Sequence, residues 1–154
     1  MLLQLFINNY AIIDKLNIKP DVHLNIVTGE TGAGKSIILG ALSLILGERA
    51  DTSVLINKET KCIVEATFDV KQNDAFKKAL KQAELDVEEQ CIIRREINSA
   101  GKSRAFVNDT PVTLAVLNSL TALLVDLHQQ FDTLTLGDME FQRTVLDALA
   151  NVQK

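Results

Sequence analysis

The chain has 154 residues, 47% of them hydrophobic, and a net charge of -4 at pH 7. This length corresponds to about one domain, and the apolar content is sufficient for a buried core. A chain with this net negative charge is not attracted to nucleic acid as a whole, so its overall charge does not indicate a nucleic-acid-binding protein. Any contact with DNA would depend on a local basic patch.

The N-terminal segment is predicted to form three strands. Residues 2–8 and 11–18 have the pattern of two strands joined at Asn8-Asn9-Tyr10, where the asparagines either serve the turn or lie near a bound ligand. A third strand is expected at Leu24–Thr28, where apolar residues predominate as in a buried strand.

The third strand leads into a glycine-rich loop, Gly29-Glu30-Thr31-Gly32-Ala33-Gly34-Lys35-Ser36, which fits G-x-x-x-x-G-K-[ST] at every fixed position. The glycines let backbone N–H groups turn inward around phosphate oxygens. A helix expected at Lys35–Leu46, with Gly47 at its C′ position, directs its positive end to the same place. Lys35 would reach the β- and γ-phosphates and Ser36 would supply a hydroxyl to Mg²⁺, so the loop predicts a nucleotide-binding site.

The rest of the chain alternates strands and helices, which indicates an α/β fold. The basis is period-2 alternation for strands and a capping residue before each helix. The expected elements are a strand at Cys62–Val70, a helix from an Asn73 cap to about Leu85, a hairpin around Ser99-Ala100-Gly101, a short helix capped by Thr113 and a strand at Leu123–Leu127.

Two further segments allow more than one interpretation. Arg94, Arg95, Lys102 and Arg104 form the one basic concentration, which is either a solvated strand face or a contact for a phosphate backbone. From Glu140 onward the apolar spacing is that of an amphipathic helix, which is either core packing or the root of a coiled coil.

Several features favour a cytoplasmic protein. The N-terminus carries no basic region or small-residue cleavage site, and the longest apolar run is about half the length of a bilayer crossing. Cys62 and Cys91 form no CxxC pair, and both occur in strand-like runs. We therefore expect a soluble chain with reduced, core-facing cysteines.

The phosphate loop is shared by several classes of protein. A GTPase is disfavoured because the nearest guanine-reading run, Asn57-Lys58-Glu59-Thr60, has threonine in place of aspartate, and D-x-x-G is absent. A self-contained small kinase remains an alternative, with Asp126 at the end of an apolar strand as the Walker B residue. Against it, no arginine-rich lid follows and Leu127-His128 stands where a catalytic glutamate would be expected. A non-catalytic nucleotide-binding module is the third possibility.

Segments along most of the chain resemble, in order, the N-terminal head segment of the RecN family, bacterial DNA-repair ATPases related to the SMC proteins and the ABC ATPases. The combination that carries the resemblance is GETGAGKSI in the loop, LGERAD after the helix and GKSRAFVN in the hairpin. INNYAIIDKLNI, VEATF and LVDLHQQFD add to it. The similarity extends from the first strand to about Phe131.

This resemblance implies a P-loop ATPase head of the ABC/SMC type, of which the chain is the N-terminal half only, with a mixed sheet around the phosphate-loop helix and an antiparallel section. Residues 1–139 would be the lobe and 140–154 the start of a helix leading to a coiled coil. The other half of the same head would carry the signature motif, the Walker B acids and the switch histidine. Two heads would sandwich two ATP molecules with Mg²⁺, acting on DNA in the bacterial nucleoid.

The family's site residues transfer to named positions. Gly29 to Ser36 match the phosphate loop, and Gln130 falls where the Q-loop glutamine is expected. Lys35 and Gln130 would then be catalytic, and Ser36 and Gln130 would contact Mg²⁺ or the attacking water. The family commonly has glycine between His128 and Gln130, whereas this chain has Gln129, which competes for the role. Without the groups of the missing half, we expect negligible hydrolysis by this chain alone.

Overall fold

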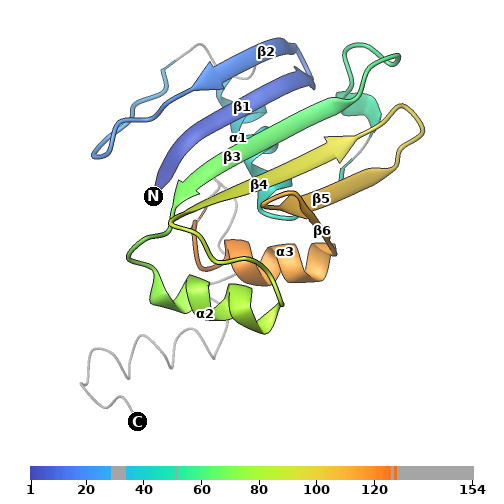
Figure 1. Ribbon diagram of the computed structural model, residues 1–154. Helices are drawn as coiled ribbons and strands as arrows, with labels where there is room; N and C mark the ends of the chain where they lie inside the picture. The colour runs from blue at the N-terminus through green and yellow to red at the C-terminus, as the bar shows by residue number, and fades with distance from the viewer. Residues whose placement is uncertain (29–33, 51, 126, 128–154) are drawn as a thin grey trace, which may run out of the picture.

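The computed structural model describes residues 1–28, 34–50, 52–125 and 127 (Figure 1). These residues form one sheet and three α-helices. The strands are β1 (Leu2–Tyr10), β2 (Ile13–Ile18), β3 (Cys62–Asp69), β4 (Gln90–Ile97), β5 (Ser103–Val107) and β6 (Thr110–Val112). The helices are α1 (Gly34–Ile45), α2 (Asp74–Gln82) and α3 (Leu114–Thr121), with a 3-10 turn at Thr52–Val54.

The described strands pair in the order β2-β1-β3-β4-β5-β6, and every pair is antiparallel. This confirms the expected antiparallel section. Helix α1 crosses one face of the sheet, and α3 lies beside the β5–β6 edge with α2 next to it (Figure 1). The arrangement holds the phosphate-loop helix against the centre of the sheet.

Alternating side chains explain which face of the sheet is buried. In β3 the side chains of Cys62, Val64, Ala66 and Phe68 are fully buried, while their neighbours are partly or fully exposed. The same alternation continues in β4, and α1 contributes Ala41, Leu44 and Ile45 to this core. The period of two therefore places one face of the sheet against α1 and leaves the other accessible.

The turn between the first two strands differs from its prediction. Strand β1 continues through Asn8, Asn9 and Tyr10, and Tyr10 pairs with Ile13, so the turn consists of Ala11 and Ile12. Asn9 is buried and has a φ of 55°. Its side chain binds a distant loop, donating from Nδ2 to the Asn57 and Thr60 carbonyls at 2.8 and 2.9 Å. The predicted turn at Asn8-Asn9-Tyr10 is therefore wrong, and Asn9 instead makes a long-range contact.

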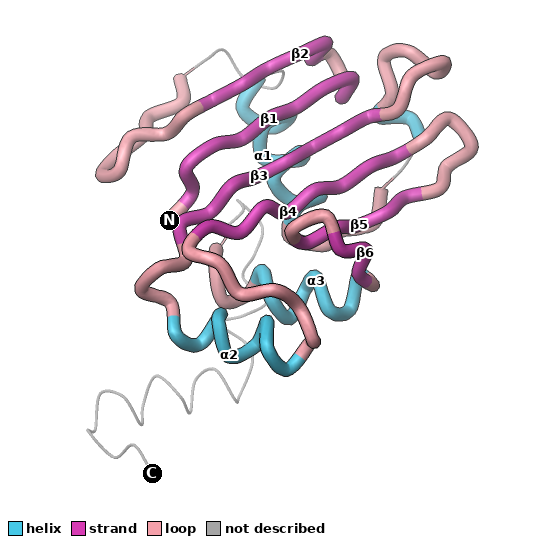
Figure 2. The backbone as a smooth tube through the Cα atoms, viewed as in Figure 1, coloured by secondary structure: helices cyan, strands magenta, loops and turns pink. Residues whose placement is uncertain are grey.

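The predicted strand at Leu24–Thr28 is wrong for this structure: the segment contains no regular structure (Figure 2). Leu24 and Ile26 are 74% and 75% exposed, and Val22 and Val27 are also exposed. A strand requires a neighbour for its backbone hydrogen bonds. No strand of the described residues pairs with this segment, so its apolar residues remain on the surface.

The helix caps agree with the predictions. The Asn73 side chain accepts a hydrogen bond from Phe76 N at 3.0 Å, and the Thr113 hydroxyl accepts one from Val116 N at 3.3 Å. After α3, however, Leu124 N and Val125 N both donate to Thr121 O. Residues 122–124 therefore form turns, and the strand expected from Leu123 is not present in its described part.

Cys62 and Cys91 are free thiols and lie fully buried in β3 and β4. Burial raises the pKa of Cys62 to about 11. Burial, together with the nearby Glu88, raises the pKa of Cys91 to about 12. Both thiols are therefore protonated near neutral pH and serve as core residues, as predicted.

Candidate nucleotide-binding site

The candidate site begins at the N-terminus of α1. Gly34, Lys35 and Ser36 form its first turn and are exposed, and this turn contains no acidic residue. Apart from the neighbours of Gly34 in the chain and the backbone of its own helix, no described residue lies within 4 Å of where a Cβ on Gly34 would stand. The remaining residues of the predicted loop, 29–33, lie outside the described residues.

This end of α1 has the properties that an anion requires. The first N–H groups of a helix have no partner within the helix, and the aligned peptide dipoles place about half a positive charge there. The Lys35 ammonium adds a full positive charge at the same end, and Ser36 contributes a hydroxyl. Polyphosphate and Mg²⁺ therefore fit the residues present.

The opposite end of α1 is held by three sets of hydrogen bonds. Gly47 N donates to Leu44 O at 3.1 Å and Glu48 N donates to Ser43 O at 3.0 Å, which is a Schellman motif with Gly47 at C′ as predicted. The Thr121 hydroxyl of α3 lies 3.2 Å from Leu46 O and 3.0 Å from Leu117 O in its own helix, so its proton is shared between these acceptors. The Thr121 contact connects the C-terminal end of the phosphate-loop helix to α3, across a large sequence separation.

Arg95 makes the third set of bonds. Its side chain is 0% exposed in the middle of β4, between Val64 of β3 and Ala105 of β5. Nη1 donates to Leu44 O at 2.9 Å and to Glu48 O at 3.1 Å. Burial lowers the pKa of the guanidinium, which still stays charged near neutral pH. A cation at the C-terminus of α1 is stabilised by the helix dipole, and no carboxylate among the described residues forms an ion pair with it.

The middle of α1 approaches β1 closely. A Cβ on Gly40 would lie 2.7 Å from the Tyr10 hydroxyl oxygen, closer than real contacts allow. Tyr10 is buried, and burial raises its pKa, with smaller contributions from Cys62 and Glu48. A Cβ at Gly40 would therefore force the buried Tyr10 side chain to shift, which shows how closely α1 packs on β1 at this point.

We expect Gly47→Ala to lower the free energy of unfolding by about 2 kcal/mol. Gly47 has a φ of +100°, and an added Cβ would lie 1.5 Å from Asn118 Oδ1 of α3. Urea denaturation of Gly47→Ala, Asn118→Ala and the double variant separates the backbone strain from the clash with Asn118. A change below about 0.5 kcal/mol for Gly47→Ala would show that the φ at this position carries no strain.

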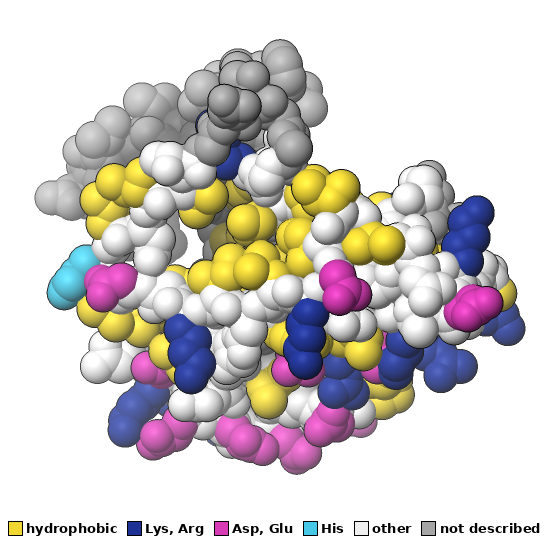
Figure 3. Space-filling model, turned by 90° about the horizontal axis from the view of Figure 1, so that it is seen from above, with side chains coloured by type: hydrophobic (Ala, Val, Ile, Leu, Met, Phe, Trp, Pro, Cys, Tyr) yellow, Lys and Arg dark blue, Asp and Glu magenta, His cyan; other side chains and the backbone are white. Residues whose placement is uncertain are grey.

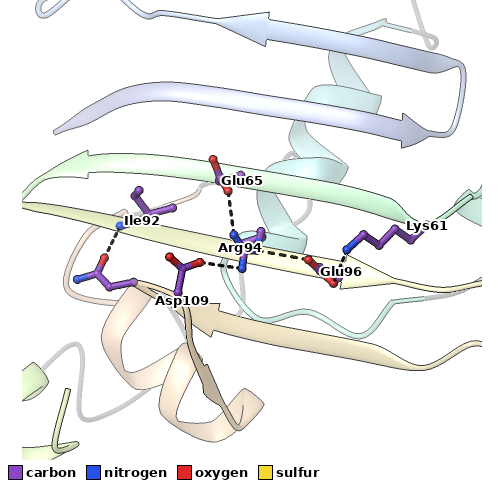
Figure 4. Close-up of polar contacts among 7 residues, drawn as sticks. Lys61, Glu65, Ile92, Arg94, Glu96 and Asp109 are labelled. Atoms are coloured by element: carbon purple, nitrogen blue, oxygen red, sulfur yellow. Dashed lines mark hydrogen bonds and ion pairs between the residues drawn. The ribbon is translucent and has the colours of Figure 1, made fainter. Parts of the chain in front are cut away.

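The basic residues of the hairpin do not form one patch. Arg95 faces the core, whereas Arg94 lies on the accessible face among carboxylates (Figure 4). Arg94 nitrogens lie 2.9 Å from Asp109, 3.4 Å from Glu96 and 3.6 Å from Glu65, and its guanidinium stacks on Phe106. The charge of Arg94 is thus compensated, and it is not available to an external anion.

Several predicted residues lie outside the described residues. They are Asp126, His128, Gln129, Gln130 and the amphipathic stretch from Glu140. Sequence reasoning, for its part, did not single out Arg95 as a residue that holds α1. The sequence did contain a sign that Arg95 is buried, because Arg95 lies on the same, odd-numbered face of β4 as the apolar residues Cys91, Ile93 and Ile97.

Comparison with known proteins identifies relatives for most of the chain. The AAA domain family matches residues 4–141. The DNA repair protein RecN of Vibrio cholerae is 41% identical over 97% of the chain, and that of Bacillus subtilis is 36% identical over 99%. The chain covers 27% of the length of each of these relatives. The predicted resemblance to RecN is therefore confirmed.

Solved structures show the same fold. The Smc head domain of Pyrococcus yayanosii, with a coiled coil and joint, superposes with a TM-score of 0.71 at 18% identity, covering 97% of this chain and 32% of that one. A chain from a study of ATP-driven dimerization and DNA-stimulated activation of SMC ATPases gives a TM-score of 0.66 at 17% identity, covering 96% and 98%. The predicted fold class, an SMC-type head, is confirmed.

Proposed function

This chain belongs to the AAA domain family, and we propose that it is the ATP-binding half of a RecN-like ATPase head that acts in DNA double-strand break repair. The observation that carries the proposal is the N-terminus of α1. There the end of a G-x-x-x-x-G-K-[ST] motif forms an exposed helical turn with a lysine, a serine and no acidic residue.

The site residues divide the work of binding MgATP. The backbone amides of residues 29–36 would hold the phosphates, and Lys35 would compensate the negative charge on the β- and γ-phosphates. Ser36 would hold Mg²⁺ through its hydroxyl. We assign the Q-loop role, contact with Mg²⁺ or the attacking water, to Gln130, with Gln129 as the competing residue.

The exposed apolar segment supports an incomplete head. Val22, Leu24, Ile26 and Val27 lie on the surface without a strand to pair with among the described residues. Seen from above, hydrophobic side chains line a hollow beside the residues that are not described (Figure 3). Exposed apolar surface of this kind marks an interface. We propose that the C-terminal half of the same head covers it and that a second head completes the ATP site.

The wider assignments follow from the relatives. Residues 1–139 would form the N-terminal lobe, and 140–154 would begin a helix toward a coiled coil. DNA is the partner suggested by the repair proteins that match, and the bacterial cytoplasm, near the nucleoid, is the corresponding location. No helix in the described part of the chain has both the length and the apolar character needed to cross a membrane.

Phosphate release tests the proposal directly. We expect no turnover of MgATP by this chain alone, and turnover when the C-terminal head segment of a RecN relative is supplied in trans. The acidic residues and signature motif that catalyse phosphoryl transfer would come from that segment. Turnover by the chain alone, abolished by Asp126→Asn, would instead establish a self-contained kinase or ATPase. No turnover in either case would leave a nucleotide-binding module.

A further inference from the structure

The fold creates a basic pocket that combines the hairpin with a strand distant in sequence. A pocket of about 210 Å³ is lined by Lys61, Glu96, Asn98, Lys102 and Arg104. Lys61 immediately precedes β3 and reaches across to β4, where its ammonium lies 3.0 Å from Glu96 (Figure 4). Arg104 of β5 lies directly opposite Glu96 in the register of the two strands.

The pocket carries an excess of positive charge. Its lining contains three cations and one carboxylate, which gives a net charge of +2. Glu96 is already shared between Lys61 and Arg94. Within the described residues, Lys102 and Arg104 form no ion pair, and both are exposed. Two cations therefore remain available to an external anion on a chain whose overall charge is -4.

The backbone around these cations is held in place. Asn98 Oδ1 accepts from Ala100 N at 3.1 Å and from Lys102 N at 2.9 Å, and Asn98 N donates to Lys102 O at 3.0 Å. On the next residue, the Ser103 hydroxyl accepts from Arg95 Nη2 at 2.6 Å. Lys102 and Arg104 thus lie on either side of Ser103, which is hydrogen-bonded to the buried Arg95. The backbone of this segment is therefore already ordered, and little conformational freedom is lost when the two cations bind an anion.

We propose that this pocket binds the phosphodiester backbone of DNA. The inference deepens the proposed function, on which the choice of DNA as partner rests. Lysine and arginine are the usual ligands of backbone phosphates. No aromatic residue lines the pocket, so it has no platform for stacking a base. The contact is therefore independent of sequence and depends on salt.

Binding of a fluorescent duplex DNA to the chain, measured by anisotropy between 50 and 200 mM salt, tests this pocket. The slope of log K against log salt is negative, and each lost phosphate contact reduces its magnitude by about 0.9. We expect Lys102→Gln/Arg104→Gln to make this negative slope shallower by about 1.8, so that the loss of affinity between 50 and 200 mM salt becomes about tenfold smaller. Glu96→Gln, which raises the net charge of the pocket, should tighten binding.

The matched control is Lys78→Gln/Lys81→Gln, which removes the same charge from exposed positions on α2. It should leave the slope unchanged. Equal slopes for the two double variants, or no binding to DNA by the unaltered chain at 50 mM salt, would overturn the proposal. So would binding to anionic phosphatidylserine vesicles in place of DNA. ATP-induced thermal stabilisation should survive Lys102→Gln/Arg104→Gln, so a failure of the pocket is distinguishable from a failure of nucleotide binding.

Discussion

We expect Arg95→Ala to lower the free energy of unfolding by about 3–5 kcal/mol. The substitution removes three hydrogen bonds from a charged donor, to Leu44 O, Glu48 O and Ser103 Oγ. It also leaves a cavity in the centre of the buried face, because Arg95 is the largest of the fully buried side chains in the described part of the chain. Since Leu44 and Glu48 lie at the C-terminal end of α1, that end of the phosphate-loop helix loses an anchor.

Arg94→Ala is the matched control, because it removes the same side chain from the adjacent residue. Arg94 is 26% exposed and its three carboxylate partners include Asp109, which is 82% exposed. Ion pairs of this kind contribute about 0–1 kcal/mol. Urea denaturation followed by circular dichroism compares the two variants. If Arg95→Ala proves too unstable to purify, Arg95→Met retains most of the volume and should lose less. Equal losses for the adjacent arginines would contradict the role given to Arg95.

The contrast between these arginines shows what the sequence could and could not predict. Alternation along β4 already indicates that residues 94 and 95 face opposite sides. Local signals likewise predicted the Asn73 and Thr113 caps and Gly47 at C′, because each cap is made by groups a few residues apart. The partners of Arg95 lie about fifty residues away, and no local pattern encodes them.

The same limit explains the errors. An apolar run predicts burial, but whether Leu24–Thr28 becomes a strand depends on a neighbouring strand that is absent from the described residues. The basic pocket depends on strand register, which brings Lys61 beside Glu96. The phosphate loop could be proposed from the sequence for the opposite reason, because its eight positions are contiguous, and its role in binding phosphate stays a prediction. Its geometry beyond Gly34, Lys35 and Ser36 stays a prediction.

Lys35→Ala should remove most of the stabilisation that MgATP provides. A ligand at 100 times its Kd raises the free energy of unfolding by about 2.7 kcal/mol, and the ammonium of Lys35 is the one full positive charge in the first turn of α1. Thermal unfolding with and without MgATP measures the loss. Ser36→Ala should weaken binding only when Mg²⁺ is present, because we assign its hydroxyl to the metal.

Without nucleotide, Lys35→Ala should have the opposite effect. A cation at the N-terminus of a helix is opposed by the helix dipole, at a cost of about 0.3–1 kcal/mol. Lys35 is exposed and no acidic residue in the first turn offsets it, so the ligand-free variant should be equally stable or slightly more stable. Lys78→Ala on α2 serves as the control and should alter neither measurement. Full stabilisation of Lys35→Ala by MgATP would contradict a phosphate-binding role for Lys35. If the ligand-free variant is instead more stable but no longer stabilised by MgATP, Lys35 contributes to binding and not to folding.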